Sequence, residues 1–196
     1  MQKIKINSSK AFFTSDLHLF HAKIIEYCNR PVANVNEMHD LIIKNWNNVV
    51  PEDATVFIQG DASWKGKDAC EPIISQLNGN KIFIIGNHDS PSIFPLFSSY
   101  HDMLLVDIYD EEDEVNILAH LSHYPLVEWF GSQKGNLHFH GHLHSTDENR
   151  ITGKNRIDVG MDGNNLTPYS YNNLKSILKI LKLMDYVEKK IKHFKS

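Results

Sequence analysis

Short apolar runs alternate with helical patterns over residues 10–89, and a polar cluster follows each run. Buried strands are predicted at residues 10–14, 54–59 and 81–85. Helices are predicted at 21–28, from Asn36 as N-cap to Val49, and at 67–77. This order predicts a mostly parallel α/β sheet with right-handed crossovers. Ligands of such sheets gather at the carboxyl ends of the strands, which is where the polar clusters lie.

The second half of the chain predicts further strands and a last helix. Strands are expected at 102–109, at 114–120, up to Gly141 and near 156–159. The acidic residues 110–113 are expected to form a solvated hairpin tip. Ser170 can cap the last helix, whose core side would consist of Leu174, Ile177, Leu178, Leu181, Met184 and Val187. Its lysines, Lys175 among them, are expected on a solvated face, with a weak phosphate-backbone contact as the alternative.

Composition indicates one domain and gives no sign of a membrane or disulfide-bonded protein. A chain of 196 residues with 41% hydrophobic side chains suits a single domain, so residues 1–196 are predicted to form one. The net charge of −4 gives no general bias toward nucleic acid. Cys28 and Cys70 form no C-x-x-C pair, which favours a reduced, cytoplasmic protein. No apolar run reaches the roughly 20 residues of a membrane span, and no signal peptide is expected.

Histidines are concentrated in residues 137–144. His138, His140, His142 and His144 alternate there, so all would project from one face of a continuous strand. Gly141 lets the chain leave the strand, and the last two rings can then turn toward one point. Imidazole is the commonest metal ligand among side chains, so this stretch indicates a metal site. A histidine-rich surface loop is the alternative.

Polar residues with ligand chemistry follow the predicted strands in a fixed order. The set is Asp16-x-His18, Gly60-Asp61, Gly86-Asn87-His88-Asp89, His123 and Gly141-His142-x-His144. This ordered pattern resembles that of the calcineurin-like metallophosphoesterase superfamily, in particular its small stand-alone bacterial and phage members. The resemblance implies an α/β fold in which two mixed β-sheets pack as a sandwich flanked by helices, the four-layer αββα arrangement.

The resemblance also implies a binuclear metal centre. One ion would be held by Asp16, His18, Asp61 and His144, and the other by Asp61, Asn87, His123 and His142. Asp61 would bridge the ions, because a carboxylate has an oxygen for each. The mixture of carboxylate, amide and imidazole suits manganese first, with iron, zinc, nickel or cobalt as alternatives. The absence of thiolate ligands argues against a structural zinc site.

Four further residues are candidates for catalysis or substrate binding. By the resemblance, His88 would donate a proton or a hydrogen bond to the leaving group or the phosphoryl group, with Asp89 orienting its ring. A surface histidine is the alternative for His88. Arg30 is expected to bind substrate, since guanidinium groups suit bidentate phosphate binding. His21 is expected either to face the site from the first turn of its helix or to lie outside it.

The expected function is therefore that of a hydrolase, a two-metal phosphoesterase acting on phosphate mono- or diesters of small molecules or nucleotides. The alternative is a 2′,3′-cyclic phosphodiesterase or a nuclease acting on nucleic-acid ends. A catalytically inactive binding module is disfavoured, because none of the seven ligand positions is missing. The partners expected are thus a small phosphate ester or nucleotide and no membrane, and the oligomeric state is left open.

One motif departs from that of the protein Ser/Thr phosphatases in this superfamily. Their pattern is G-D-x-x-D-R-G, whereas Trp64 and Lys65 replace the second aspartate and the arginine here. This difference argues against phosphoprotein substrates. Trp64 is expected either to lie over the site mouth, where a base can stack on it, or to pack in the core.

Overall fold

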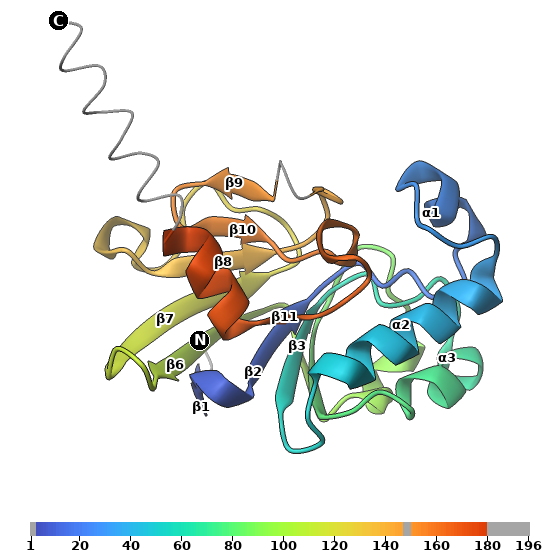
Figure 1. The fold of residues 1–196 in the computed structure, drawn as a ribbon, viewed down its shortest axis with the longest axis horizontal. Coiled ribbons are helices and arrows are strands. Elements are labelled where there is room, and N and C mark those ends of the chain that lie inside the picture. The colour runs from blue at the N-terminus through green and yellow to red at the C-terminus, as the bar shows by residue number, and fades with distance from the viewer. Residues whose placement is uncertain (1–2, 147–149, 180–196) are drawn as a thin grey trace, which may run out of the picture.

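Two mixed β-sheets pack face to face in the computed structural model, which describes residues 3–146 and 150–179 (Figure 1). The strand order is β1-β6-β7-β8-β10-β9 in the six-stranded sheet and β11-β2-β3-β4-β5 in the five-stranded sheet. The α/β class and the two-sheet arrangement expected from the sequence are confirmed. Within the described ranges, no helix combines the length and hydropathy of a membrane span.

The strands and helices have the following bounds. The strands are β1 Lys3–Asn7, β2 Ala11–Thr14, β3 Thr55–Gln59, β4 Asn80–Ile84, β5 Ser99–His101, β6 Met103–Asp110, β7 Val115–Ser122, β8 Leu137–His140, β9 Ile151–Gly153, β10 Arg156–Asp158 and β11 Tyr169–Ser170. The α-helices are α1 Ala22–Tyr27, α2 Val35–Val49 and α3 Lys67–Ile74, and residues 171–179 are also helical. Short 3-10 helices are Ser8–Lys10, Pro91–Leu96, Ser132–Lys134 and Met161–Asn164.

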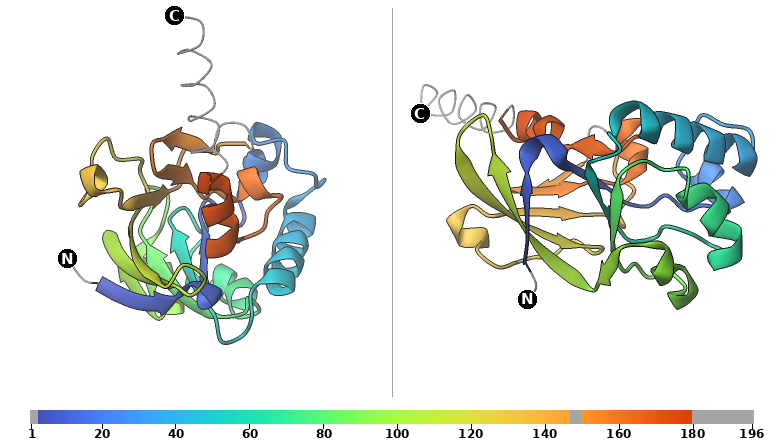
Figure 2. Two further views of the ribbon diagram at one scale, coloured as in Figure 1. Left: turned by 60° about the vertical axis from the view of Figure 1, so that its left-hand side comes forward. Right: turned by 90° about the horizontal axis from the view of Figure 1, so that it is seen from below.

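The five-stranded sheet contains the strand–helix alternation that the sequence predicts. Strands β2, β3, β4 and β5 are parallel, and β11 is antiparallel at the edge beside β2. Helices α1–α3 gather on its outer side, away from the six-stranded sheet (Figures 1 and 2). The fully buried Trp46 of α2 packs there with Val56, Ile58 and Phe83 of the sheet. The short strands β1, β5, β9 and β11 were not predicted.

A second core lies between the sheets. Phe13 of β2 stacks on Phe57 of β3, with ring centroids 5.3 Å apart, and meets Phe139 of β8 edge-on at 4.9 Å. All three rings have 0% exposure. This packing fixes the end of β2 against β3 and β8, and five of the seven candidate ligands follow these three strands.

The helix at 171–179 confirms one prediction and corrects another. Ser170 Oγ accepts a hydrogen bond from the Asn173 N–H at 3.1 Å, as expected of an N-cap, and Leu174 and Leu178 are buried. The predicted core positions Leu181, Met184 and Val187 lie outside the described residues. The expectation that Lys175 is solvated is wrong. Its Nζ lies 2.9 Å from Asp110 Oδ1, and Asp110 is itself buried rather than part of a solvated tip.

Helix α2 begins two residues earlier than the sequence predicted. Its N-cap is Asn34, whose Oδ1 accepts a hydrogen bond from the Glu37 N–H at 3.0 Å. Glu37 Oε2 in turn accepts from the Ala33 N–H at 3.0 Å. Asn36, the predicted cap, lies inside the helix and is exposed.

This capping geometry gives a stability prediction. Asn34→Ala should lower the free energy of unfolding by about 1 kcal/mol, because it leaves an N–H of the first helical turn without its side-chain acceptor. Asn36→Ala, the matched control, should change it by less than about 0.5 kcal/mol. Urea denaturation followed by circular dichroism measures both. Equal effects of the two substitutions would contradict the assignment of the cap.

Candidate metal centre

The residues predicted as metal ligands come together where strands of both sheets end. Asp16 and His18 follow β2, Asp61 follows β3, Asn87 follows β4, His123 follows β7, and His142 and His144 follow β8. The backbone joins several of these loops directly. The Asp16 N–H donates to the Gly60 carbonyl at 3.0 Å, and the His18 N–H donates to the Asp61 carbonyl at 2.9 Å. These bonds join the loop after β2 to the loop after β3, and the Gly141 N–H, which donates to the His123 carbonyl at 2.9 Å, joins the loop after β8 to the loop after β7.

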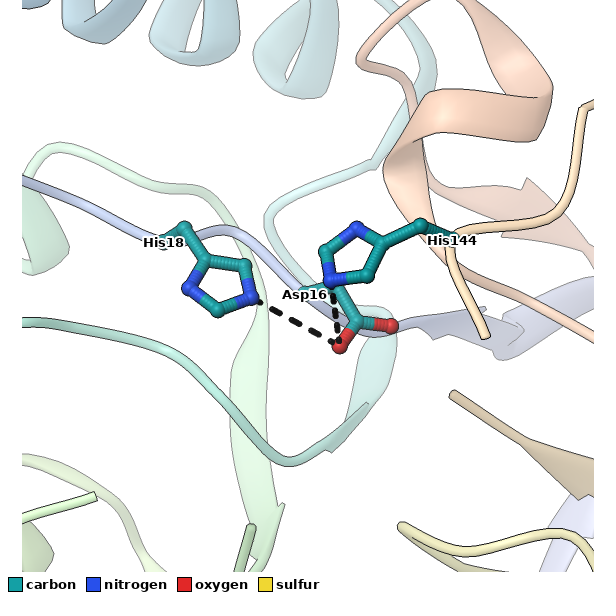
Figure 3. A group of neighbouring side chains, drawn as sticks. All are labelled: Asp16, His18 and His144. Atoms are coloured by element: carbon teal, nitrogen blue, oxygen red, sulfur yellow. Dashed lines mark ion pairs between the residues drawn. The ribbon is translucent and has the colours of Figure 1, made fainter. Parts of the chain in front are cut away.

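The first group of ligand atoms surrounds the carboxylate of Asp16 (Figure 3). Asp16 Oδ1 lies 3.9 Å from His18 Nε2 and 3.9 Å from His144 Nε2. Asp61 Oδ2 approaches the same His18 nitrogen at 3.6 Å. The side chains of Asp16 and Asp61 are 0% and 3% exposed, so both carboxylates are almost completely removed from water.

The second group contains Asp61, His123 and Asn87. His123 Nε2 lies 2.9 Å from Asn87 Oδ1 and 3.5 Å from Asp61 Oδ2. The other ring nitrogen, Nδ1, donates to the Gln59 carbonyl at 2.8 Å. In a neutral ring this leaves Nε2 with its lone pair directed toward two oxygen atoms. Asp61 takes part in both groups, which is the position expected of a bridging ligand.

His142 joins the second group through its ring and the first through its backbone. Its ring centroid lies 5.1 Å from that of His123 and 4.7 Å from that of Tyr124. Its N–H donates to Asp16 Oδ2 at 3.0 Å. Burial lowers the pKa of the His142 ring, which favours the neutral form that binds metals. The structure thus brings together all seven predicted ligands.

The donor atoms fit divalent cations. Both ring nitrogens of His18 are buried without a hydrogen-bond partner, an arrangement that native proteins rarely leave unexplained. Burial, followed by the neighbouring His144, lowers the pKa of His18 to about 2, so its ring is neutral. Burial also raises the pKa of Asp16 to about 8. A cation held between these groups would be a partner for the free lone pairs and would stabilise the carboxylates as anions.

The backbone at these positions adopts unusual conformations. Five of the seven predicted ligands have positive φ: Asp16 58°, His18 49°, Asp61 52°, His142 73° and His144 49°. Non-glycine residues rarely adopt such angles, and the residues that do are concentrated at functional sites. Gly141 allows the closest approach in this region, since a Cβ there would overlap Ser15 Oγ and Asp16 Oδ2. A Cβ at Gly86 would similarly overlap Asp61.

The sequence predicted that Asp89 orients His88, but its oxygens face the backbone instead. Its Oδ2 accepts hydrogen bonds from the N–H groups of Asp61 and Gly86, both at 2.8 Å. Its Oδ1 accepts from the Ala62 N–H at 2.8 Å. With its oxygens engaged by the backbone, Asp89 ties the loop after β3 to the loop after β4. It therefore positions Asp61.

Arg30 does not contact the cleft, so the predicted substrate-binding role is not supported. Its side chain is 1% exposed, and its Nε donates to Asp162 Oδ1 at 2.8 Å. Nη1 and Nη2 donate to the carbonyls of Leu17 and Asp16, both at 2.8 Å. Arg30 therefore supports the loop after β2 from the protein interior.

Asp162 is a residue that the sequence analysis missed. Its Oδ2 accepts from His144 Nδ1 at 2.7 Å, which leaves His144 Nε2 directed toward Asp16. Burial opposes ionisation of Asp162, but hydrogen bonds from His144 and Arg30 lower its pKa to about 2. A carboxylate behind a histidine is a common support for a metal ligand. No motif surrounds Asp162, so only the tertiary structure reveals it.

A cleft of about 590 Å³ opens beside the first group of ligands. It is lined by His18, His21, Lys23, Ile24, Tyr27, Cys28, Trp64, His88 and His144. The exposed ring of His88 lies 5.8 Å from that of His18, measured between centroids. His21 faces the site, with its ring 5.4 Å from that of His18. Trp64 is 48% exposed in the same cleft, so the core alternative for it is wrong.

Comparisons with known proteins find relatives without a stated activity, and no family model matches the chain. The Gene 66 protein of Mycobacterium phage L5 is 32% identical over 79% of this chain and 87% of its own length. The Gene 66 protein of phage D29 is 31% identical over 79% of this chain and 88% of its own length. An uncharacterized protein of Methanocaldococcus jannaschii is 49% identical over 83 residues, which are 41% of this chain and 47% of that protein.

A solved structure shares the fold. The crystal structure of a protein of unknown function from Aquifex aeolicus has a TM-score of 0.64 and 23% identity to this chain. The match covers 85% of this chain and 98% of that one. At this identity the likeness concerns the fold alone.

The buried carboxylates make metal-dependent stability a direct test of the site. Adding Mn²⁺ at about a hundredfold excess over its Kd to chelator-treated protein should raise Tm by roughly 5–10 °C, because the ion binds only the folded chain. Asp16→Asn should remove most of this rise, whereas Asp53→Asn, at an exposed turn, should retain it. Differential scanning calorimetry measures the shift. An unchanged Tm in the wild type with each candidate metal would argue against a metal site.

Proposed function

This chain belongs to the family of the mycobacteriophage L5 and D29 Gene 66 proteins, and we propose that it is a two-metal phosphoesterase. It would hydrolyse phosphate mono- or diesters of small molecules or nucleotides. Its two-sheet core would then correspond to the four-layer αββα metallophosphoesterase fold. The observation that supports the proposal is the position of Asp61, whose Oδ2 lies 3.6 Å from His18 Nε2 in the first group and 3.5 Å from His123 Nε2 in the second.

The chemistry of the donors supports two ions rather than one. His18 Nε2 lies 3.6 Å from Asp61 Oδ2, and the Nε2 atoms of His18 and His144 each lie 3.9 Å from Asp16 Oδ1. His123 Nε2 lies 3.5 Å from Asp61 Oδ2 and 2.9 Å from Asn87 Oδ1. Manganese is the first choice for this mixture of oxygen and nitrogen ligands, followed by iron, zinc, nickel and cobalt. A pair of such cations supplies activation of a water molecule for attack on phosphorus and neutralises charge on the phosphate oxygens.

The protein's own groups would orient the ester and complete proton transfer. His88 lies on the cleft side of the site, and its backbone N–H donates to Asp61 Oδ1 at 3.0 Å. That bond fixes the backbone of His88 beside the ligands, while the exposed ring remains able to reach a leaving-group oxygen. The ring is suited to giving that oxygen a proton as the P–O bond breaks.

The structure weakens one argument for the nuclease alternative. A phosphate-backbone contact by the lysines of the last helix, the alternative considered for them above, would favour a nuclease. Lys175 is instead paired with Asp110, Glu112 and Asp113, at 2.8, 2.7 and 2.9 Å. The lysines beyond residue 179 lie outside the described chain. Small phosphate esters and nucleotides therefore remain the preferred substrate class.

Removing a ligand should abolish turnover. Asp61→Ala and His142→Ala should each lower kcat/KM by roughly a thousandfold or more at a fixed metal concentration, because each weakens charge stabilisation in the transition state. Asp53→Ala is the control and should retain wild-type activity. The assay compares an aryl phosphate monoester with the bis-aryl diester after adding Mn²⁺, Ni²⁺, Zn²⁺ or Mg²⁺ to metal-free protein. Full activity of both site variants at saturating metal would refute the proposal.

His88→Ala should separate proton transfer from metal binding. The variant should keep the wild-type metal content, measured by mass spectrometry, while kcat falls about a hundredfold or more for alkyl esters. The loss should be smaller for nitrophenyl esters, because nitrophenolate needs little protonation to leave. Equal losses for both leaving groups would count against an acid role for His88.

A further inference from the structure

Exposed aromatic rings form part of the wall of the cleft beside the metal ligands. Trp64 and Tyr27 are 48% and 67% exposed, although large apolar side chains are usually buried. Both belong to the same cleft as His18 and His88. These rings come from separate segments, the loop after β3 and the end of α1, so their assembly depends on the fold.

The aromatic rings are ordered relative to one another. Trp64 stacks on His21, with centroids 4.3 Å apart and ring planes 12° from parallel. The ring of Tyr27 meets the ring of His21 edge-on, with the two centroids 6.4 Å apart. Packed rings lose little further freedom when a ligand binds, so the wall is already arranged to accept a flat partner.

The wall begins on the side of the site where the leaving group would depart. The centroid of His88 is 5.8 Å from that of the ligand His18 and 4.9 Å from that of Trp64. His88 therefore neighbours both the ligand His18 and Trp64. A substrate with phosphorus at the ligands and its leaving oxygen at His88 would extend its leaving group toward Trp64.

We propose that Trp64, supported by His21 and Tyr27, binds the base of a nucleoside that forms the leaving group of the substrate. This inference rests on the proposed phosphoesterase function and specifies its substrate class. Flat rings with polar edges suit a purine or pyrimidine, since base–aromatic stacking is strong and tolerates any base. An aliphatic chain would find only Ile24 as an aliphatic neighbour in the lining.

The test compares esters that differ only in the base. The kcat/KM values are measured for a nucleoside 5′-monophosphate and for ribose 5-phosphate, each also as its methyl diester. Trp64→Ala should lower the ratio of nucleoside to ribose substrate by roughly tenfold or more, the range expected for one stacked base. Trp64→Phe should restore much of the ratio, because a ring remains. Phe130→Ala removes an aromatic side chain that is 61% exposed outside the cleft, and it should leave the ratio unchanged.

A binding measurement separates this inference from the proposed function. Saturation-transfer NMR on metal-free protein should show contact with the base protons of adenosine, and Trp64→Ala should remove it. Loss of turnover on every ester, with this contact intact, would reject the phosphoesterase and leave the base site standing. No contact in the wild type, or an unchanged substrate ratio in Trp64→Ala, would overturn the base site.

Discussion

The arrangement of the whole site follows from the burial of two carboxylates, Asp16 and Asp61, next to each other. Neither has a lysine or arginine side chain as an ion-pair partner among the described residues. Placing such anions in a protein interior is strongly unfavourable unless a cation or several donors compensate them. Burial lowers the pKa of His18 and His142 beside them, so these two rings are neutral and act as ligands rather than as counter-ions. The geometry is understandable if cations belong to the folded state.

The fold meets this requirement with short loops that support one another. Asp89 binds the N–H groups of the loops after β3 and β4, while Arg30 binds the carbonyls of the loop after β2. Asp162 connects Arg30 to His144 and so joins the loop after β8 to the same assembly. These contacts can hold the ligands in left-handed backbone conformations that would be unfavourable in a free loop.

The convergence of the candidate ligands could be predicted from the sequence, because polar residues after successive parallel strands meet at one edge of a sheet. Their supports could not. A buried guanidinium and a phosphate-binding guanidinium look the same in sequence. Arg30 is of the first kind because Asp162 and the carbonyls of Leu17 and Asp16 bind it in the interior. Likewise, Asp89 follows His88 directly but faces the backbone. The predicted N-cap of α2 was Asn36 and the observed one is Asn34, because both asparagines can cap a helix and the sequence does not distinguish them.

Under the proposed function, bond breaking and substrate selection would lie on different segments. The ligands lie at strand ends packed between two sheets, where substitutions would disturb the core as well as the ions. Tyr27 and Trp64 lie on exposed segments, and replacing either would alter the cleft without opening a buried cavity. Loop positions of this kind can change while the scaffold stays intact. If the proposed function holds, one core could therefore serve different leaving groups, and the residue at position 64 would decide which of them this chain accepts.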